Sequence, residues 1–218
     1  MKPQLSIRLL CAALLAAAGH AEIIDRIAVS VGNDVITTGD VEREIRVAAF
    51  LNGTKPDFSA ATKRAAADRL VEQDLIRREL ELTRFSTPEA AAAVTPFLEF
   101  RKSQFASEAE FDRALSEAGL TEKQLKDELL WQLTLLNFLD VRFRPGVQVT
   151  DQDLHEYFDK VVRPIAQAAH PDEPVRFEDY RDKMAETLTG ERADQQMDQW
   201  LKDTRKRTDI VYHDEALQ

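Results

Sequence analysis

Cysteine is almost absent from this 218-residue sequence, since the single one, Cys11, lies within the first 21 residues. We expect those residues to be removed during export, which would leave a mature chain without thiols or disulfides. Such a chain is held together by packing alone and excludes thiol chemistry. A lipid anchor on Cys11 is not favoured, because almost no apolar run precedes it.

Long hydrophobic runs are lacking as well. Residues 1–21 combine the basic Lys2 and Arg8 with an apolar run over 9–18 and a small-residue cleavage site that ends at Ala21. A membrane-spanning helix needs about 20 apolar residues, so this run predicts a secretory signal peptide rather than an anchor, and a buried N-terminal helix is the less favoured alternative. No later run is more apolar, so we expect an exported protein without stable membrane insertion.

Positive charge is in deficit. The chain has 29 basic and 39 acidic side chains and a net charge of −10, and loss of residues 1–21 would change the net charge to −12. Nucleic-acid surfaces need clustered positive charge. The sequence therefore predicts no nucleic-acid partner.

The motifs of common catalytic and cofactor sites are missing too. The sequence has no Gly-x-Ser-x-Gly elbow, phosphate-binding loop or Gly-x-Gly-x-x-Gly fingerprint. After signal removal His155, His170 and His213 remain, and none of them has the spacing of a metal ligand set. Carboxylate pairs such as Glu108 and Glu110 lie at predicted helix starts, where they complement the helix dipole. We expect no enzyme activity, no cofactor and no bound metal.

The first element that the sequence predicts is a β-hairpin. Apolar and small residues alternate over 27–31, Gly-Asn-Asp at 32–34 favours a turn, and 35–37 is a short return strand. A helix is predicted to start near Gly39. A two-stranded ribbon is marginal in water, and residues 209–213 read as the strand that would complete it.

The rest of the chain has mainly helical periodicity. Capping boxes and turn residues mark the helix ends. The predicted helices cover 40–51, 60–85, a kinked segment from Pro88 to Phe105 around Pro96, 107–119, about twenty residues from Thr121, a helix after Thr150, and 177–205. The fold class predicted is mainly α: a helical domain with a small antiparallel β-sheet formed by the N-terminal hairpin and a C-terminal strand.

These elements suggest five segments. The predicted division is a signal peptide at 1–21, a helical domain at 22–149, an exit helix and proline-containing linker at 150–174, a C-terminal helix and strand at 175–213 that complete the helical domain, and a tail at 214–218.

Large aromatic side chains are frequent on the predicted helices. Each one can be a plain core residue, but helices with wide apolar faces can also leave a groove that binds peptides. The candidate peptide-binding residues are Phe97, Phe100, Phe105, Trp131 and Phe138.

The order of several segments resembles the SurA-type family of periplasmic chaperones. The similarity covers nearly all of residues 22–213 and lies in the ordered series rather than in one motif. The segments concerned are the hairpin and helix start from Asp25 to Val41, Leu70 to Ile76, Phe111 to Leu125, Val149 to Tyr157, and Phe177 to Ile210. Gly39 departs from the Ser or Thr that usually caps the first helix.

The resemblance implies an ATP-independent periplasmic chaperone, a holdase for unfolded or nascent outer-membrane proteins. Family members usually carry parvulin prolyl-isomerase domains, but residues 150–174 are far too few for one, so no catalytic residue is carried over. The alternatives are a prolyl-isomerase-related protein and a structural adaptor with one fixed periplasmic partner. Because the C-terminal segment follows a linker, it can return to its own hairpin or to a neighbour's, as in a domain-swapped homodimer.

Overall fold

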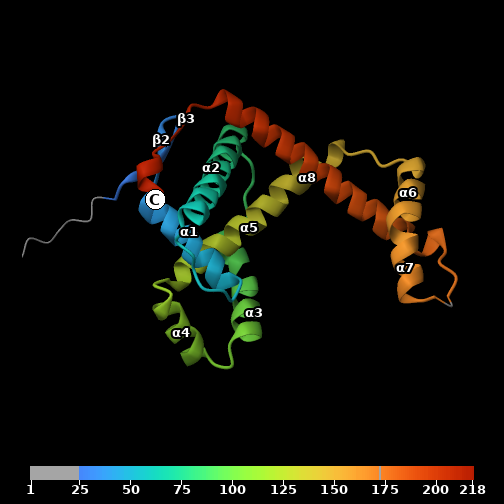
Figure 1. Ribbon diagram of the computed structural model, residues 1–218, viewed down its shortest axis with the longest axis horizontal. Helices are drawn as coiled ribbons and strands as arrows, with labels where there is room; N and C mark the ends of the chain where they lie inside the picture. Colours follow the sequence, from blue (N-terminus) through green and yellow to red (C-terminus); the bar gives the residue numbers. More distant parts are fainter. Residues whose placement is uncertain (1–24, 172) are drawn as a thin grey trace, which may run out of the picture.

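The computed structural model describes residues 25–171 and 173–218. The predicted signal peptide lies outside the described residues. Figure 1 shows a body at one end, built from the sheet and α1 to α5, and a small lobe at the other end that carries α6 and α7. The long helix α8 runs from the lobe back to the sheet, so the two parts share one element.

The sheet joins the two ends of the described chain. Strands β1 (Ile27–Val31), β2 (Asp34–Thr37) and β3 (Ile210–Tyr212) are antiparallel in the order β2-β1-β3. Gly32 makes the hairpin turn with a φ of +57°, a conformation that glycine adopts without strain. The predicted third strand is confirmed, and with it the mainly α fold with a small antiparallel sheet.

The helices follow the predicted order. They are α1 (Thr38–Leu51), α2 (Ala60–Thr83), α3 (Val94–Gln104), α4 (Glu108–Glu117), α5 (Glu122–Arg142), α6 (Asp151–Tyr157), α7 (Arg163–Ala169) and α8 (Arg181–Arg207). Short 3₁₀ turns cover 90–93, 144–146, 177–179 and 214–216, and the π-helical turn η3 covers Phe158–Val162.

The start of α1 explains why a glycine is found there. Thr37 is the N-cap and forms a capping box with Asp40. The backbone N–H of Gly39 donates to the Asp25 carboxylate at 2.9 Å, and a Cβ at this position would lie 2.7 Å from Asp25 Oδ2. Gly39 therefore lies in the first turn and allows Asp25 to approach closely, while Thr37 supplies the cap.

Three boundaries differ from the sequence-based prediction. The segment around Pro96 begins with a 3₁₀ turn, and Pro96 lies in the first turn of α3, where its missing N–H leaves no helical bond unmade. The predicted linker is helical over Arg163–Ala169. Pro164 is compatible with this helix because it lies in the first turn. The last helix begins at Arg181 rather than Phe177, after a 3₁₀ turn.

Buried apolar side chains form three clusters. The largest lies between the sheet, α1, α2, α5 and α8, the second joins α1, α3, α4 and the start of α5, and the third holds the lobe together. Ala193 and Leu201 of α8 belong to the largest cluster, whereas Met184 and Leu188 of the same helix belong to the lobe. The 27 residues of α8 span about 40 Å. Within the described residues, no helix combines the length and apolar character needed to cross a membrane.

Candidate functional site

Three of the five predicted peptide-binding residues lie in the hydrophobic cores. Phe97 and Phe138 are only 2% and 1% exposed, and Trp131 is also buried. The ring of Phe97 packs edge-on against Phe111, with 5.6 Å between ring centroids, and the ring of Phe138 contacts the rings of Phe85, Phe143 and Trp200. Phe97 and Phe138 therefore form core, because neighbouring aromatic rings cover them, and Trp131 is buried with the Arg77 guanidinium over its ring.

Phe100 and Phe105 are half-buried at the edge of the second core. Both rings pack around Phe50, at centroid distances of 6.0 and 5.8 Å. Phe100 also lines a hollow of about 460 Å³ between α1 and α5, together with Leu51 and Leu129. Contact of Phe100 and Phe105 with a peptide stays a prediction.

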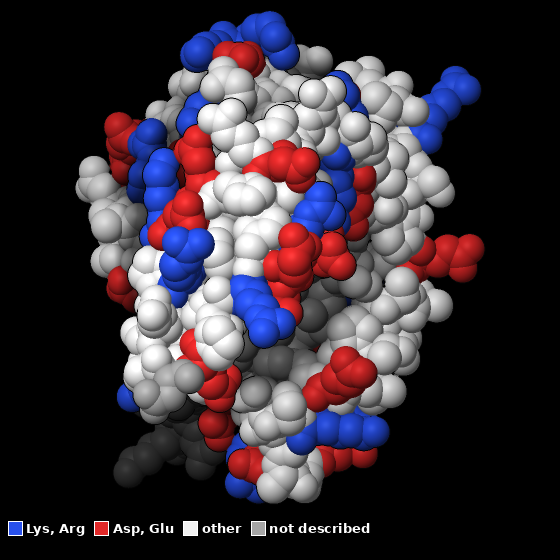
Figure 2. Space-filling view, turned by 90° about the vertical axis from the view of Figure 1, so that its right-hand side faces the viewer, with Lys and Arg blue, Asp and Glu red and all other residues white. Residues whose placement is uncertain are grey.

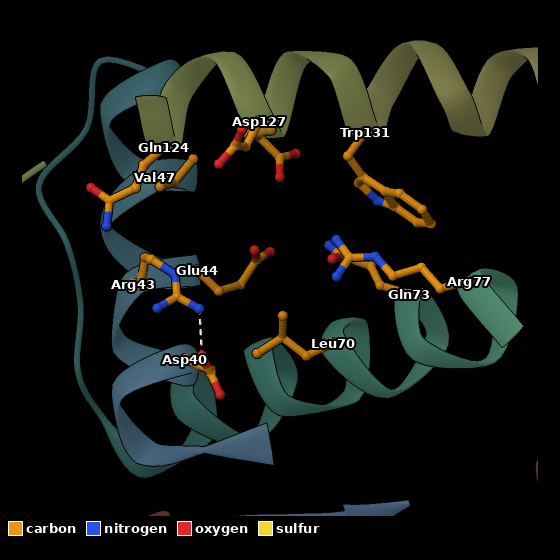
Figure 3. Close-up of a pocket in the computed structure, with 11 residues that line it drawn as sticks. Asp40, Arg43, Glu44, Val47, Leu70, Gln73, Arg77, Gln124, Asp127 and Trp131 are labelled. Carbon is orange, nitrogen blue, oxygen red and sulfur yellow. Dashed lines mark hydrogen bonds and ion pairs between the residues drawn. The ribbon is translucent and has the colours of Figure 1, made fainter. Parts of the chain in front are cut away.

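A smaller hollow of about 140 Å³ lies between α1, α2 and α5. Glu44 and Arg77 point toward its centre from opposite sides (Figure 3). Glu44 accepts a hydrogen bond from Arg69 at 3.1 Å, and the Arg77 guanidinium lies 4.8 Å from the centroid of the Trp131 ring. Burial raises the pKa of Glu128, which also lines this hollow, and the negative charge of Glu44 adds to the effect.

The chemistry of this hollow is that of a polar contact between helices. Its described lining residues provide carboxylates, guanidinium groups and amides but no hydroxyl, thiol or imidazole that could act as a nucleophile. Glu44 and Asp40 are engaged by Arg69 and Arg43.

The most apolar hollow lies on the lobe, between the η3–α7 segment and the first turns of α8. This apolar groove has a volume of about 360 Å³, within the range of small-molecule and peptide sites. Its lining side chains are mostly aliphatic or aromatic: Tyr157, Val161, Val162, Ile165, Ala166, Ala169, His170, Tyr180, Lys183, Met184 and Thr187.

The π-helical turn explains why apolar side chains stay uncovered here. In a continuous α-helix, Phe158, Val161 and Ile165 would share one face. The wider winding of η3, with i→i+5 bonds, shifts the following residues around the helix axis. Phe158 is buried in the lobe core, whereas Val161 and Ile165 are 36% and 66% exposed, and every residue of α7 retains solvent exposure. The π-helical turn thus lies where the buried Phe158 gives way to the exposed Val161 and Ile165.

Charged residues flank the lobe, and several of them form ion pairs with one another. Figure 2 looks at this end of the molecule and shows an uncharged strip between acidic and basic side chains. Glu156 pairs with Lys160 at 3.0 Å, and Asp151 pairs with Arg181 at 3.0 Å. The lobe therefore presents an apolar strip with a polar margin, which is the usual anatomy of a protein-binding surface.

Comparison of the chain with models of known protein families and with curated protein sequences gave no match. The resemblance to the SurA-type chaperones therefore stays a prediction from the sequence.

Sequence reasoning missed Ile165, Ala166 and Ala169 as lining residues. The three prolines at 164, 171 and 174 favoured a linker, although Val161, Ile165 and Ala169 recur every four residues. That spacing was the available signal for an amphipathic helix.

Proposed function

We propose that this protein is an ATP-independent periplasmic chaperone that holds unfolded or nascent outer-membrane proteins, and that the apolar groove of the lobe is its client-binding site. The observation that carries the proposal is the groove itself: aliphatic and aromatic side chains, including the 66%-exposed Ile165, gathered beside the lobe core at the end of α8. Large exposed apolar patches mark binding surfaces.

The composition of the groove suits many client sequences. Met184 is buried beneath the groove, and the half-buried rings of Tyr157 and Tyr180 offer broad apolar contact with a polar tip. Such surfaces can repack around different partners. Binding an unfolded chain lowers the concentration of its free, aggregation-prone form by mass action, so no nucleotide is needed.

The resemblance to SurA-type chaperones supports both the periplasmic location and outer-membrane proteins as the clients. The predicted signal peptide is consistent with export to the periplasm. The segment that follows the exit helix in this chain folds as η3 and α7. We include no prolyl-isomerase activity in the proposal, because no residue can be matched to the parvulin site.

An aggregation assay tests the proposal. The purified mature chain, mixed at equimolar ratio with a urea-unfolded outer-membrane porin, should reduce light scattering after dilution. Ile165→Asp should weaken this protection several-fold, because a carboxylate would enter the apolar groove. Leu82→Asp is the matched control, since Leu82 is 82% exposed on α2 in the body. Unchanged porin aggregation with the wild-type chain would overturn the proposal.

A structural adaptor is the second candidate. Burial of Phe97, Trp131 and Phe138 reduces the exposed aromatic surface and leaves a single compact groove as the most apolar hollow of the described chain. A compact groove also fits one fixed partner. A photo-crosslinking amino acid at position 165 would separate the two in cells: a spread of client products supports the chaperone, and one stoichiometric product supports the adaptor.

A further inference from the structure

We propose that Gly190 of α8 and Gln148, which lies just before α6, form a hinge on which the lobe swings relative to the body. The apolar groove would then change its position relative to α1 to α5, while each hydrophobic core keeps its packing. The hinge does not depend on the proposed function, because it concerns the two parts of the molecule and not what the groove binds.

The chain joins body and lobe at two places, and each connection passes from one core to the other within a few residues. In α8, Leu188 belongs to the lobe core and Ala193 to the largest cluster, in the body. Before α6, Val147 packs against the body cluster and Val149 against the lobe core. None of the described residues belongs to both clusters, and Figure 1 shows the lobe apart from α1 to α5. A rotation between these residues therefore breaks no contact within either core.

Gly190 weakens α8 at this level. A helix interior disfavours glycine because glycine loses the most backbone freedom there. Nothing in the described surroundings requires it, since its φ is not positive and a Cβ would lie 3.9 Å from Arg144 Nη2, an ordinary contact distance. The Thr189 hydroxyl donates to the carbonyl oxygen of Ala185 at 2.7 Å, and bonds of this kind often bend helices. The helix is thus weaker between the two cores than its packing demands.

Gln148 provides the second pivot. Residues 147–150 are neither helix nor strand, so a few backbone torsions can absorb a rotation there. The Arg192 guanidinium donates to the Gln148 carbonyl oxygen, which holds this segment beside α8 only two residues beyond Gly190. Two neighbouring pivots define one axis, so the expected motion is a hinge rather than independent tumbling of the lobe.

Partly exposed ion pairs hold the lobe in the position that the structure shows. Arg192 pairs with Asp153 of α6 at 2.6 Å, and Arg144 pairs with Glu186 in the lobe half of α8 at 2.8 Å. Each pair joins a residue on the body side of Gly190 to one on the lobe side. Such pairs contribute little to stability and are screened by salt. The lobe therefore has a preferred position that weak contacts maintain.

Double electron–electron resonance on the full mature chain tests the hinge. Spin labels at Leu82→Cys in α2 and Gln167→Cys in α7 report the distance between body and lobe, because both side chains are exposed and no other cysteine is expected. We expect more than one distance in this labelled chain. Gly190→Ala should reduce the displaced populations about fivefold, because alanine favours the continuous helix. Arg192→Gln should increase the same populations, because it removes one of the ion pairs.

Asp198→Ala is the matched control. It also raises the helix propensity of α8 at an exposed position, but in the half that packs against the body, so the distance populations should not change. Labels at Leu82→Cys and Lys202→Cys, both in the body, should give a single distance in every variant. Circular dichroism checks that each variant is folded. A single body-to-lobe distance without further substitution, or populations that Gly190→Ala leaves unchanged, would overturn the inference.

Discussion

Arg205 of α8 and Asp68 of α2 are joined by a hydrogen-bonded ion pair of 2.8 Å, and the Tyr212 hydroxyl donates to the same carboxylate. The Arg64 guanidinium lies over the Tyr212 ring, 3.6 Å from its centroid. Burial alone would raise the pKa of Asp68, but the hydrogen bonds from Tyr212 and Arg205 outweigh it and hold that pKa below its ordinary value. The C-terminal helix and strand are thus attached to α2 by a specific polar cluster as well as by the core.

Removal of the Tyr212 hydroxyl should weaken this attachment. Tyr212→Phe keeps the ring under Arg64 but takes one donor from Asp68, so the free energy of unfolding should fall by about 1 kcal/mol. Urea denaturation followed by circular dichroism measures the change. Tyr180→Phe in the lobe is the control and should have little effect on the same transition. Equal stability of Tyr212→Phe and wild type would show that the hydroxyl contributes nothing to closure.

The same cluster predicts loss of stability in alkali. Burial and the hydrogen bond to Asp68 raise the pKa of Tyr212 to about 12, above the ordinary value of about 10. Because the folded state holds this proton more tightly, the contribution is complete below about pH 10 and is lost as the pH rises toward 12. Melting curves between pH 9 and pH 12 should show a decline that is smaller in Tyr212→Phe. An identical decline in both proteins would contradict this assignment.

Ionised Glu128 should destabilise the folded chain at neutral pH. Burial raises its pKa, and the charge of Glu44 adds to that rise, so the ionised form is less favourable in the folded chain than in the unfolded one. Its unfavourable effect is absent below the unfolded pKa and develops as the pH rises through the folded value. Glu128→Gln should therefore raise the melting temperature at pH 7 by a few degrees and change it little at pH 4. Glu117→Gln, an exposed carboxylate at the end of α4, is the control.

Local patterns were sufficient to predict the sheet. The alternation over 27–31, the turn residues at 32–34 and the apolar residues at 210–212 each indicate a strand or a turn from neighbours in sequence. The pairing of the strands then follows from the need to cover the exposed edge of the hairpin. The capping box at Thr121 was predictable for the same reason. In contrast, Ser107 and Glu110 do not form a complete capping box. The Ser107 hydroxyl accepts a hydrogen bond from the backbone N–H of Glu110, but the Glu110 carboxylate accepts from the backbone N–H of Ala106 rather than from that of Ser107.

The groove could not be predicted in the same way. Periodicity shows that Phe97 and Phe138 lie on apolar faces, but it does not show which side chains cover those faces. Their burial depends on rings such as Phe111 and Trp200, which are distant in sequence. The π-helical turn has no simple residue signature, so the exposure of Val161 and Ile165 required the structure.

The lobe should unfold separately from the body. Its core contains few buried side chains, and Phe158 is the largest of them. Phe158→Ala should destabilise the lobe by about 3–5 kcal/mol, which exceeds what so small a core supplies, so α6 and α7 would open locally. Hydrogen–deuterium exchange should show faster exchange in Asp151–Ala169 and unchanged protection in α2.

Phe138→Ala, a substitution in the body core, is the comparison for the exchange experiment on Phe158→Ala. Phe138 lies between the rings of Phe85, Phe143 and Trp200, so Phe138→Ala should lower the protection of α2 and α5 together. Loss of protection throughout the chain in Phe158→Ala would show that lobe and body form one cooperative unit.

A disulfide across the sheet should reveal whether the C-terminal strand returns to its own hairpin. Ser30 of β1 and Val211 of β3 are directly paired, and opposed residues of antiparallel strands lie within disulfide range. The mature chain is expected to have no cysteine of its own, so Ser30→Cys combined with Val211→Cys can form only one bridge within a chain. Because α8 packs against both the body core and the lobe of the same chain, we expect oxidation to give a monomer on a non-reducing gel, with faster migration than the reduced form. The single variant Val211→Cys controls for random oxidation between molecules. A covalent dimer specific to the double variant would instead demonstrate exchange of the strand between two chains.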